Sequence, residues 1–144
     1  MQLKLFTIKV CFLQIKYFSK DLWASTSDTP QMRSGVVGYS YILGVCSINY
    51  KFSISEEIGG FYYASVVAHE LGHCLGSQHD SEPGIAIAAN CPQSDNYIMT
   101  PTSGAYTNNL LNQFLFSNCS ILQFKKGLLT QDLRFVYFLS SILS

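Results

Sequence analysis

The chain has 144 residues, a length typical of one domain, and 48% of them are hydrophobic, which is enough to build a core. Nine basic and nine acidic residues cancel to a formal net charge of +0, and charged residues make up only 12% of the sequence. No basic run or phosphate-cradling glycine loop is present, so the composition argues against nucleic acid or an anionic membrane surface as a partner.

The first elements predicted are a strand region and a loop. Residues 3–18 are rich in β-branched and aromatic side chains and predict one strand or two short ones. Three lysines interrupt the apolar run that a signal peptide or membrane anchor needs, and no small-residue cleavage site follows, so we favour a strand over either. Residues 24–35 contain many small polar side chains and Pro30, and predict a loop.

Two strands and a helix are predicted in the middle of the chain. Residues 36–45 form a strand that contains two glycines, and residues 50–57 form a further short strand beside it. Gly59 and Gly60 break the chain before a helix that we place at about residues 62–75.

All three histidines of the chain lie in one twelve-residue window of this region, a distribution that a packing role does not explain. On a helix, His69 and His73 lie one turn apart on one face and can bind one Zn²⁺ at about 2.0–2.1 Å. Glu70 can border the metal and take a proton from metal-bound water. Gly76 tolerates a positive φ and ends the helix, so His79 can approach the same ion from another side. Three neutral nitrogens and one open position are typical of a catalytic zinc site.

An alternative interpretation is an ordinary amphipathic helix with surface or core histidines, because a bare His-Glu-x-x-His recurs by chance. Gly76 and His79 extend the motif and favour the metal site. Met99, 20 residues after His79, could form an apolar floor under the imidazoles, although methionine is often simple core filler. Helical-wheel counting places an apolar face opposite the histidines, formed by Ala64, Val67, Ala68, Leu71, Cys74 and Leu75.

The C-terminal part is predicted to contain loops and a helix. Residues 81–96 and 100–113 carry glycine, proline and asparagine and are expected to be loops. Residues 120–129 predict a helix. Residues 133–143 are apolar but too short to span a bilayer, so we interpret them as a packing helix or as sequence outside the domain.

The extended zinc motif at residues 67–80, with Met99, resembles the adamalysin (reprolysin) branch of the metzincin zinc endopeptidases, the ADAM-type peptidases of family M12B. Asp80 directly after the third histidine is typical of that branch. The short spacing between motifs is most similar to that of the compact secreted members.

Two further segments carry the resemblance, which covers about residues 35–125. Residues 38–46 look like the family's Gly-x-Ala-Tyr-x-Gly-x-x-Cys segment, but Ser40 replaces the alanine and the second glycine comes one place late. Residues 116–120 look like its Phe-Ser-x-Cys-Ser signature.

The resemblance implies an α/β (α+β) metzincin-like fold, in which a twisted mixed sheet with an antiparallel edge strand lies over the zinc-binding helix. The family's catalytic domain is longer at its N-terminus, so residues 1–144 are expected to be a single, partial, N-terminally truncated domain. The edge strand that pairs with an extended peptide substrate would be formed by Gly38, Tyr39, Ser40 and Tyr41. Residues 100–113 would form a wall of the pocket for the substrate residue after the cut bond.

The resemblance also implies a zinc-dependent metalloendopeptidase that acts on extracellular proteins through zinc-activated water. One Zn²⁺ would be bound by His69, His73 and His79, with Glu70 as the catalytic base and Met99 in the structural Met-turn. The expected partners are protein or peptide substrates, with no nucleic acid and no membrane span. A secreted monomer is expected.

The five cysteines leave at least one free or bonded to another chain. By the resemblance, Cys46 and Cys119 would be bridged, while Cys91 matches a family cysteine whose usual downstream partner is missing. Cys74 lies on the apolar side of the helix and is expected to be a buried thiol. Cys11 has no counterpart in the family.

Two other functions remain open at this point. A truncated relative could be a catalytically inactive zinc-binding decoy or interaction module, although a protein without catalytic constraint could readily lose Glu70. A different zinc hydrolase could use the short motif alone, but His79 and Met99 argue against it.

Overall fold

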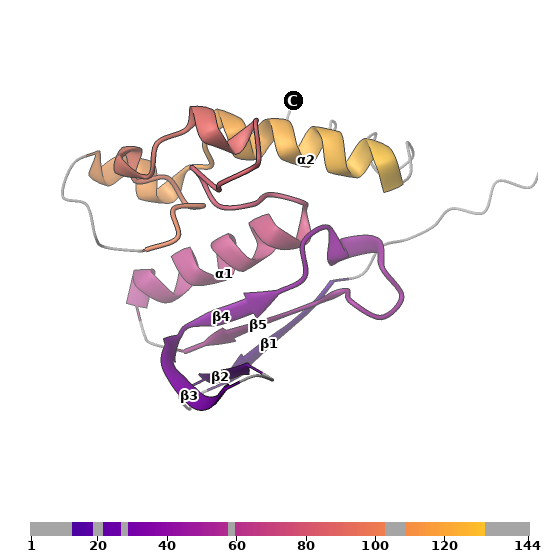
Figure 1. The fold of residues 1–144 in the computed structure, drawn as a ribbon, viewed down its shortest axis with the longest axis vertical. Helices are drawn as coiled ribbons and strands as arrows, with labels where there is room; N and C mark the ends of the chain where they lie inside the picture. Colours follow the sequence, from indigo (N-terminus) through magenta and orange to yellow (C-terminus); the bar gives the residue numbers. More distant parts are fainter. Residues whose placement is uncertain (1–12, 19–21, 27–28, 58–59, 103–108, 132–144) are drawn as a thin grey trace, which may run out of the picture.

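A computed structural model of the chain describes residues 13–18, 22–26, 29–57, 60–102 and 109–131. These residues form a mixed α/β structure in which two α-helices and five strands are joined by loops and short 3₁₀ helices (Figure 1). The strands are β1 Gln14–Phe18, β2 Leu22–Thr26, β3 Thr29–Val36, β4 Gly38–Ser40 and β5 Phe52–Glu56. The helices are α1 Gly60–Cys74 and α2 Asn118–Gln131, and the 3₁₀ helices are η1 Gly44–Cys46, η2 Ala88–Asn90, η3 Gln93–Asp95 and η4 Leu110–Phe114.

The main sheet has the order β1-β5-β4, with β1 parallel and β4 antiparallel to β5. The described part of the chain therefore contains a mixed sheet with the antiparallel strand β4 at one edge, as the resemblance implied. Burial alternates along β5, so Ser53 and Ser55 are buried while their neighbours are partly exposed. These small side chains leave room for α1, which packs on both β5 and β4.

Two predictions for the N-terminal half need correction. Residues 24–35 are not a loop, because β2 and β3 pair there as an antiparallel two-stranded sheet with irregular register. Every strand of a two-stranded sheet is an edge, where a proline such as Pro30 is tolerated. The strand predicted at 36–45 is shorter, since β4 ends at Ser40 and a turn leads into η1.

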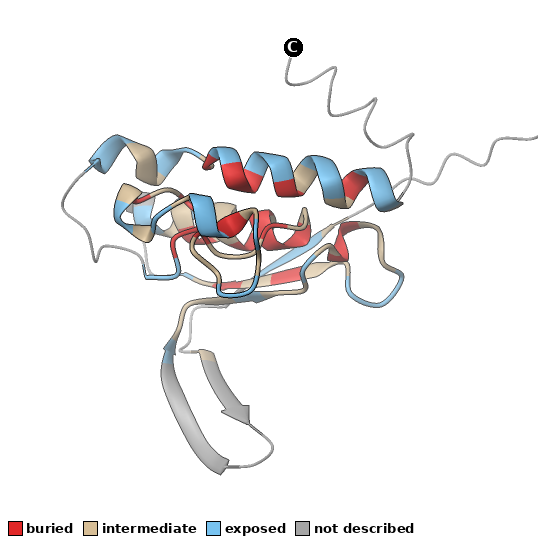
Figure 2. Ribbon diagram, turned by 45° about the horizontal axis from the view of Figure 1, so that its top comes forward, coloured by how far each residue is buried: buried red, intermediate tan, exposed pale blue. Residues whose placement is uncertain are grey.

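Helix α1 lies between the sheet and the C-terminal part of the chain, as Figure 1 shows. The structure confirms this helix, which begins two residues earlier and ends one residue earlier than predicted. Buried residues gather along α1 and on one side of α2 (Figure 2). The predicted apolar face is only partly buried: Cys74 is fully buried, but Ala64 is exposed. The face that bears Glu70 is buried too, because α1 is covered on both sides.

The end of α1 follows the prediction made for Gly76, which has a φ of +107°. The amide of Gly76 donates to the carbonyl of His73 at 2.8 Å, and the amide of Ser77 donates to that of Gly72 at 3.0 Å. This pair of bonds is the Schellman motif, which satisfies the last helical carbonyls and reverses the chain direction. The residues that follow are thereby directed back along α1.

The loops after α1 confirm the prediction for residues 81–96, which contain only the short helices η2 and η3. The predicted helix at 120–129 is confirmed as part of α2. Ser117 caps α2, because its hydroxyl accepts the amide of Ser120 at 3.1 Å. Residues 133–143 lie outside the described part of the chain. Within that part, no helix has both the length and the apolar character needed to cross a membrane.

The predicted bridge between Cys46 and Cys119 is wrong. Cys91 bonds to Cys119 across a Cα–Cα distance of 6.1 Å, so Cys91 does have a partner. The physical reason is that α2 packs on η2. Cys119 lies in the first turn of α2 and Cys91 directly follows η2, so this packing brings the two cysteines together. Cys46 is itself disulfide-bonded, but not to Cys119. Cys74 is a free, buried thiol, as predicted, and burial raises its pKa to about 11.

Candidate metal centre

Three imidazoles converge between the end of α1 and the loop that follows it. His69 and His73 project from successive turns of α1, and the turn at Gly76 returns the chain so that His79 faces them. One ligand atom from each of the three residues lies within 4.8 Å of the other two. The ring centroids form a near-equilateral triangle, with separations of 4.8, 5.1 and 4.8 Å. These side chains could therefore hold one metal ion.

Each imidazole has an oxygen atom near its Nδ1 atom. The Nδ1 of His69 lies 2.7 Å from the carbonyl oxygen of Ile98, and the Nδ1 of His73 lies 2.8 Å from that of Ser77. A carbonyl oxygen can only accept, so each Nδ1 carries the proton and each Nε2 presents a lone pair. The Nδ1 of His79 lies 3.3 Å from a carboxylate oxygen of Glu82, which favours the same tautomer.

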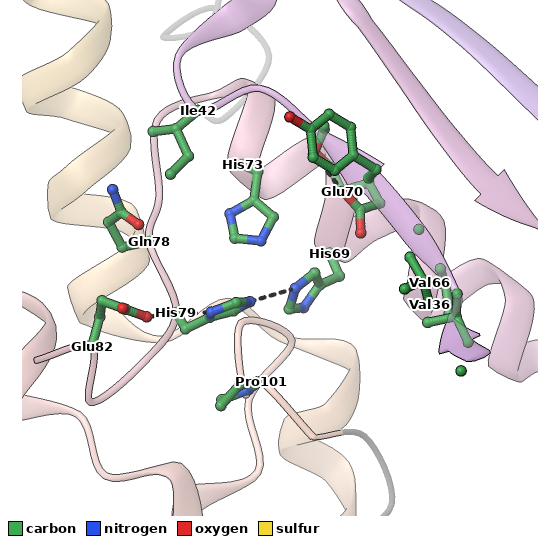
Figure 3. A pocket seen from close by; sticks show the side chains of 15 residues that line it. Val36, Ile42, Val66, His69, Glu70, His73, Gln78, His79, Glu82 and Pro101 are labelled. Atoms are coloured by element: carbon green, nitrogen blue, oxygen red, sulfur yellow. Dashed lines mark hydrogen bonds and ion pairs between the residues drawn. The ribbon is translucent and has the colours of Figure 1, made fainter. Parts of the chain in front are cut away.

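The distance between the facing Nε2 atoms tests whether an ion fits. The Nε2 atoms of His79 and His69 are 3.2 Å apart (Figure 3). Two nitrogens at zinc-bond distance from one tetrahedral ion would be about 3.3–3.4 Å apart. With both Nδ1 atoms protonated, neither Nε2 can donate to the other, so the lone pairs face each other and are suited to a shared cation. The donor set therefore fits a zinc ion.

Burial favours the neutral imidazoles that metal binding requires. Burial lowers the pKa of His69 to about 4, and it lowers the pKa of His73 as well. At neutral pH these two side chains are therefore already deprotonated. Little competition from protons opposes a metal at these two ligands.

Glu70 lies beside the histidines and is held against β4. Its side chain is 5% exposed, and burial raises the pKa of its carboxyl group, with the Ser40 hydrogen bond opposing that rise. The Ser40 hydroxyl contacts the Glu70 carboxylate and lies 2.9 Å from the Glu70 backbone carbonyl. A Cβ atom at Gly38 would come within 2.5 Å of a Glu70 carboxylate oxygen. The space that the carboxylate occupies thus depends on a glycine and a serine of β4.

Met99 lies in a turn closed by the Thr100 amide and the Tyr97 carbonyl, 3.0 Å apart. Met99 is fully buried, and a Cβ atom at Gly72 would come within 2.4 Å of its sulfur, so the thioether packs on the α1 backbone. The preceding residue, Ile98, supplies the carbonyl that His69 contacts. The turn therefore both fills space below the helix and orients a histidine.

A buried polar network fixes the loop that carries His79. Asp80 is fully buried, and one of its carboxylate oxygens accepts the Ser117 hydroxyl at 2.7 Å. Its amide donates to the Met99 carbonyl at 2.9 Å. Burial raises the pKa of Asp80, which the Ser117 hydrogen bond opposes. Since Ser117 also caps α2, Asp80 connects the loop that carries His79, here called the metal loop (residues 76–82), to α2.

The converging side chains line a cavity of about 490 Å³ between β4, α1 and the metal loop (Figure 3). Gly38, Tyr39 and Ser40 of β4 contribute to this lining. Tyr41 does not, because its ring packs against Tyr50 and Phe52 at centroid distances of 4.5 and 5.4 Å. Residues 103–108 of the predicted pocket wall lie outside the described ranges.

Two contacts in the lining escaped the sequence interpretation. Glu82 lies on the rim beside His79, and no motif indicated it. Ser40 was predicted as a residue of the substrate edge strand, but no role beside Glu70 was predicted for it. Its contact with Glu70, 30 residues away, needed the structure.

A buried carboxylate beside three converging imidazoles defines a candidate hydrolytic metal centre. The family model described as metallo-peptidase family M12B, reprolysin-like, matches residues 12–130. The chain therefore belongs to this family, whose members are zinc-dependent metallopeptidases.

Curated relatives agree with the assignment. The chain is 33% identical over 101 residues to "A disintegrin and metalloproteinase with thrombospondin motifs like" of Bombyx mori, covering 62% of this chain and 14% of that protein. It is 34% identical over 86 residues to "Venom metalloproteinase 2" of Eulophus pennicornis, covering 58% and 20%. It is 32% identical over 111 residues to "Zinc metalloproteinase-disintegrin-like kaouthiagin-like" of Naja atra, covering 72% and 17%. The chain thus spans a fifth or less of the length of these three relatives.

Proposed function

We propose that this chain is a zinc-dependent metalloendopeptidase that hydrolyses peptide bonds of extracellular proteins. The observation that carries the proposal is the convergence of His69, His73 and His79 beside the buried carboxylate of Glu70. Membership of the M12B family supports the same chemistry. The venom and disintegrin-type relatives support a secreted protein with protein or peptide substrates.

In this proposal the Nε2 atoms of the three histidines are the zinc ligands. Zinc bound there supplies a Lewis acid that polarises a carbonyl group and makes water more acidic. Glu70 accepts a proton from the attacking water on a carboxylate oxygen and later delivers it to the leaving amine. Its raised pKa suits both roles, because a carboxyl group with a pKa nearer neutrality can accept and return a proton.

The edge strand β4 is the proposed binding site for the substrate backbone. Among the described strands, β5 is the only one that pairs with β4, which leaves the outer edge of β4 available to an extended peptide. Ser40 and Gly38 face the same cavity as Glu70, so a peptide along β4 would pass the catalytic carboxylate. Met99 is the proposed structural floor of this site.

The test is metal content together with cleavage of a denatured protein substrate, with and without a chelator. We expect one zinc per chain, cleavage in its presence, loss of cleavage with the chelator and recovery on adding zinc. A chain that binds no zinc would overturn the proposal. Zinc binding without cleavage would overturn the enzymatic part and identify a zinc-binding decoy instead.

A further inference from the structure

The three candidate ligands differ in the acceptor that each imidazole meets at Nδ1. His69 and His73 meet backbone carbonyls at 2.7 and 2.8 Å. His79 meets the Glu82 carboxylate, whose nearer oxygen lies 3.3 Å from Nδ1. Side-chain substitution cannot remove a backbone carbonyl, but it can remove a carboxylate. The third ligand is therefore the one whose orientation depends on a replaceable side chain.

Glu82 is placed beside His79 by a fixed turn. Its amide donates to the carbonyl of His79 at 3.2 Å, and its own carbonyl accepts the amide of Ile85 at 3.2 Å. Ser81, which lies between His79 and Glu82 in the sequence, adopts a left-handed φ of 63°. Its hydroxyl donates to the carbonyl of Cys91 at 3.0 Å. The backbone on both sides of Glu82 is therefore anchored, and its carboxylate is directed to His79.

We propose that Glu82 is a positioning residue for the metal, acting through His79. Its carboxylate accepts the Nδ1 proton of His79, which keeps the Nε2 lone pair toward the ion and makes the imidazole a stronger donor. It also adds a negative charge near a divalent cation without occupying a coordination position. The inference rests on the proposed zinc site.

A purely structural role for the contact would give a different result. The side chains of His79 and Glu82 are 33% and 36% exposed, and contacts between such exposed groups add little to folding stability. Loss of the Glu82 carboxylate should therefore leave the unfolding of the metal-free protein unchanged. Its effect should appear in metal affinity.

The experiment compares the zinc affinity of the parent chain, Glu82→Ala and Glu82→Gln by competition with a chromophoric chelator. We expect Glu82→Ala to bind zinc about 10–100-fold more weakly, the usual effect of removing such an acceptor. Glu82→Gln should lose less, because its amide oxygen still accepts the Nδ1 proton but carries no charge. Glu57→Ala removes an exposed carboxylate directly after β5 and should match the parent within about twofold.

A second set of variants tests whether Glu82 acts through His79. In a His79→Ala background, Glu82→Ala should cause no further loss of zinc affinity. An equal loss in both backgrounds, or a Glu82→Ala affinity equal to that of the parent, would overturn the inference while leaving the zinc site intact. A parent chain that binds no zinc would instead overturn the proposed function. If Glu82→Ala does not fold, the Glu82→Gln comparison decides by the same criterion.

Discussion

The two walls of the cavity hold their functional groups in different ways. The β4 wall, residues 38–40, meets Glu70 through the Ser40 hydroxyl and the space left by Gly38. The loop wall, residues 76–82, carries His79 and meets His73 through the Ser77 carbonyl, and its Glu82 carboxylate lies beside His79. His69 instead meets the carbonyl of Ile98, which belongs to neither wall. The β4 wall therefore contacts the proposed base, and the loop wall contacts or carries two of the proposed ligands. Base and metal should accordingly be separable by substitution.

The walls also differ in how they are attached to the rest of the molecule. The β4 wall is held by three residue pairs with β5 and by its contacts with α1. The loop wall is tied to α2 through Asp80 and Ser117, and its turn is tied to the Cys91–Cys119 disulfide through Ser81. The ligand wall thus depends on long-range connections, whereas the base wall depends on the sheet.

The largest expected effect separates base from metal. Glu70→Ala should lower turnover by about 10²–10⁴-fold, the usual contribution of a positioned acid–base group, while zinc content stays the same. The measurement is cleavage rate and bound zinc on the same sample. Glu57→Ala is the control for removal of a carboxylate. Full activity in Glu70→Ala would show that the base has been misassigned.

The next effect should fall on the loop wall. Replacing Cys91 and Cys119 by serine opens a covalent loop with a sequence separation of 28 residues. The chain-entropy model gives a loss of about 3–4 kcal/mol in the free energy of unfolding, measurable by urea denaturation of the metal-free protein. Peptide mapping without reductant checks the pairing itself. Recovery of a peptide that joins Cys46 to Cys119 would contradict the structure.

Of the two features behind these predictions, the helix that carries Glu70 could be predicted from the sequence, but the disulfide could not. The zinc helix and its end were predictable because they depend on local spacing, namely two histidines one turn apart and Gly76 after the last turn. The Cys91–Cys119 pairing was not, because it depends on how α2 packs on η2. The resemblance suggested another partner for Cys119, and only the tertiary contacts corrected it.

The β-structure shows the same division. β5 was predictable from its composition, but β2 and β3 contain small polar residues and Pro30, which are typical of loops. Their pairing supplies the backbone hydrogen bonds that composition cannot reveal. The contacts of Ser40 with Glu70 and of Glu82 with His79 also depend on where the chain returns in space.

Acidic pH should weaken the metal-free fold through the buried imidazoles. The pKa of His69 is about 4 in the folded chain, against an ordinary value of 6.5, so only the unfolded chain takes up this proton between those values. Stability from this group is therefore complete above about pH 6.5 and is lost as the pH falls toward 4, by about 3 kcal/mol in total.

The measurement is urea denaturation of the chelator-treated protein between pH 4 and 7, with His69→Gln as the matched variant. Glu70 and Asp80 have raised pKa values, so their contributions have the opposite sign. Subtracting the unfolding free energy of His69→Gln from that of the parent cancels the contributions of Glu70 and Asp80, which both proteins share. The stability of the parent should fall more steeply than that of His69→Gln as the pH drops, and parallel curves would rule out a buried neutral His69.

The smallest effect tests the β4 wall alone. The Ser40 hydroxyl donates to the charged form of Glu70 and so lowers the pKa of that carboxyl group against the effect of burial. In Ser40→Ala, the charged form loses this donor, and the pKa of Glu70 should rise further above its ordinary value. Because Glu70 must be ionised to accept a proton, the acid limb of the pH profile of kcat/KM should move upward by the same amount.

The zinc affinity of Ser40→Ala shows whether β4 acts on Glu70 alone or also on the metal ligands. All three imidazoles have their Nδ1 partners away from Ser40, so Ser40→Ala should bind zinc as the parent does. Ser40→Thr keeps the hydroxyl and should keep the parental acid limb. If Ser40→Ala instead lost zinc affinity with an unmoved acid limb, β4 would support the ligands rather than the base. The two walls would then act as one unit, because a substitution in β4 would have weakened zinc binding by the histidines.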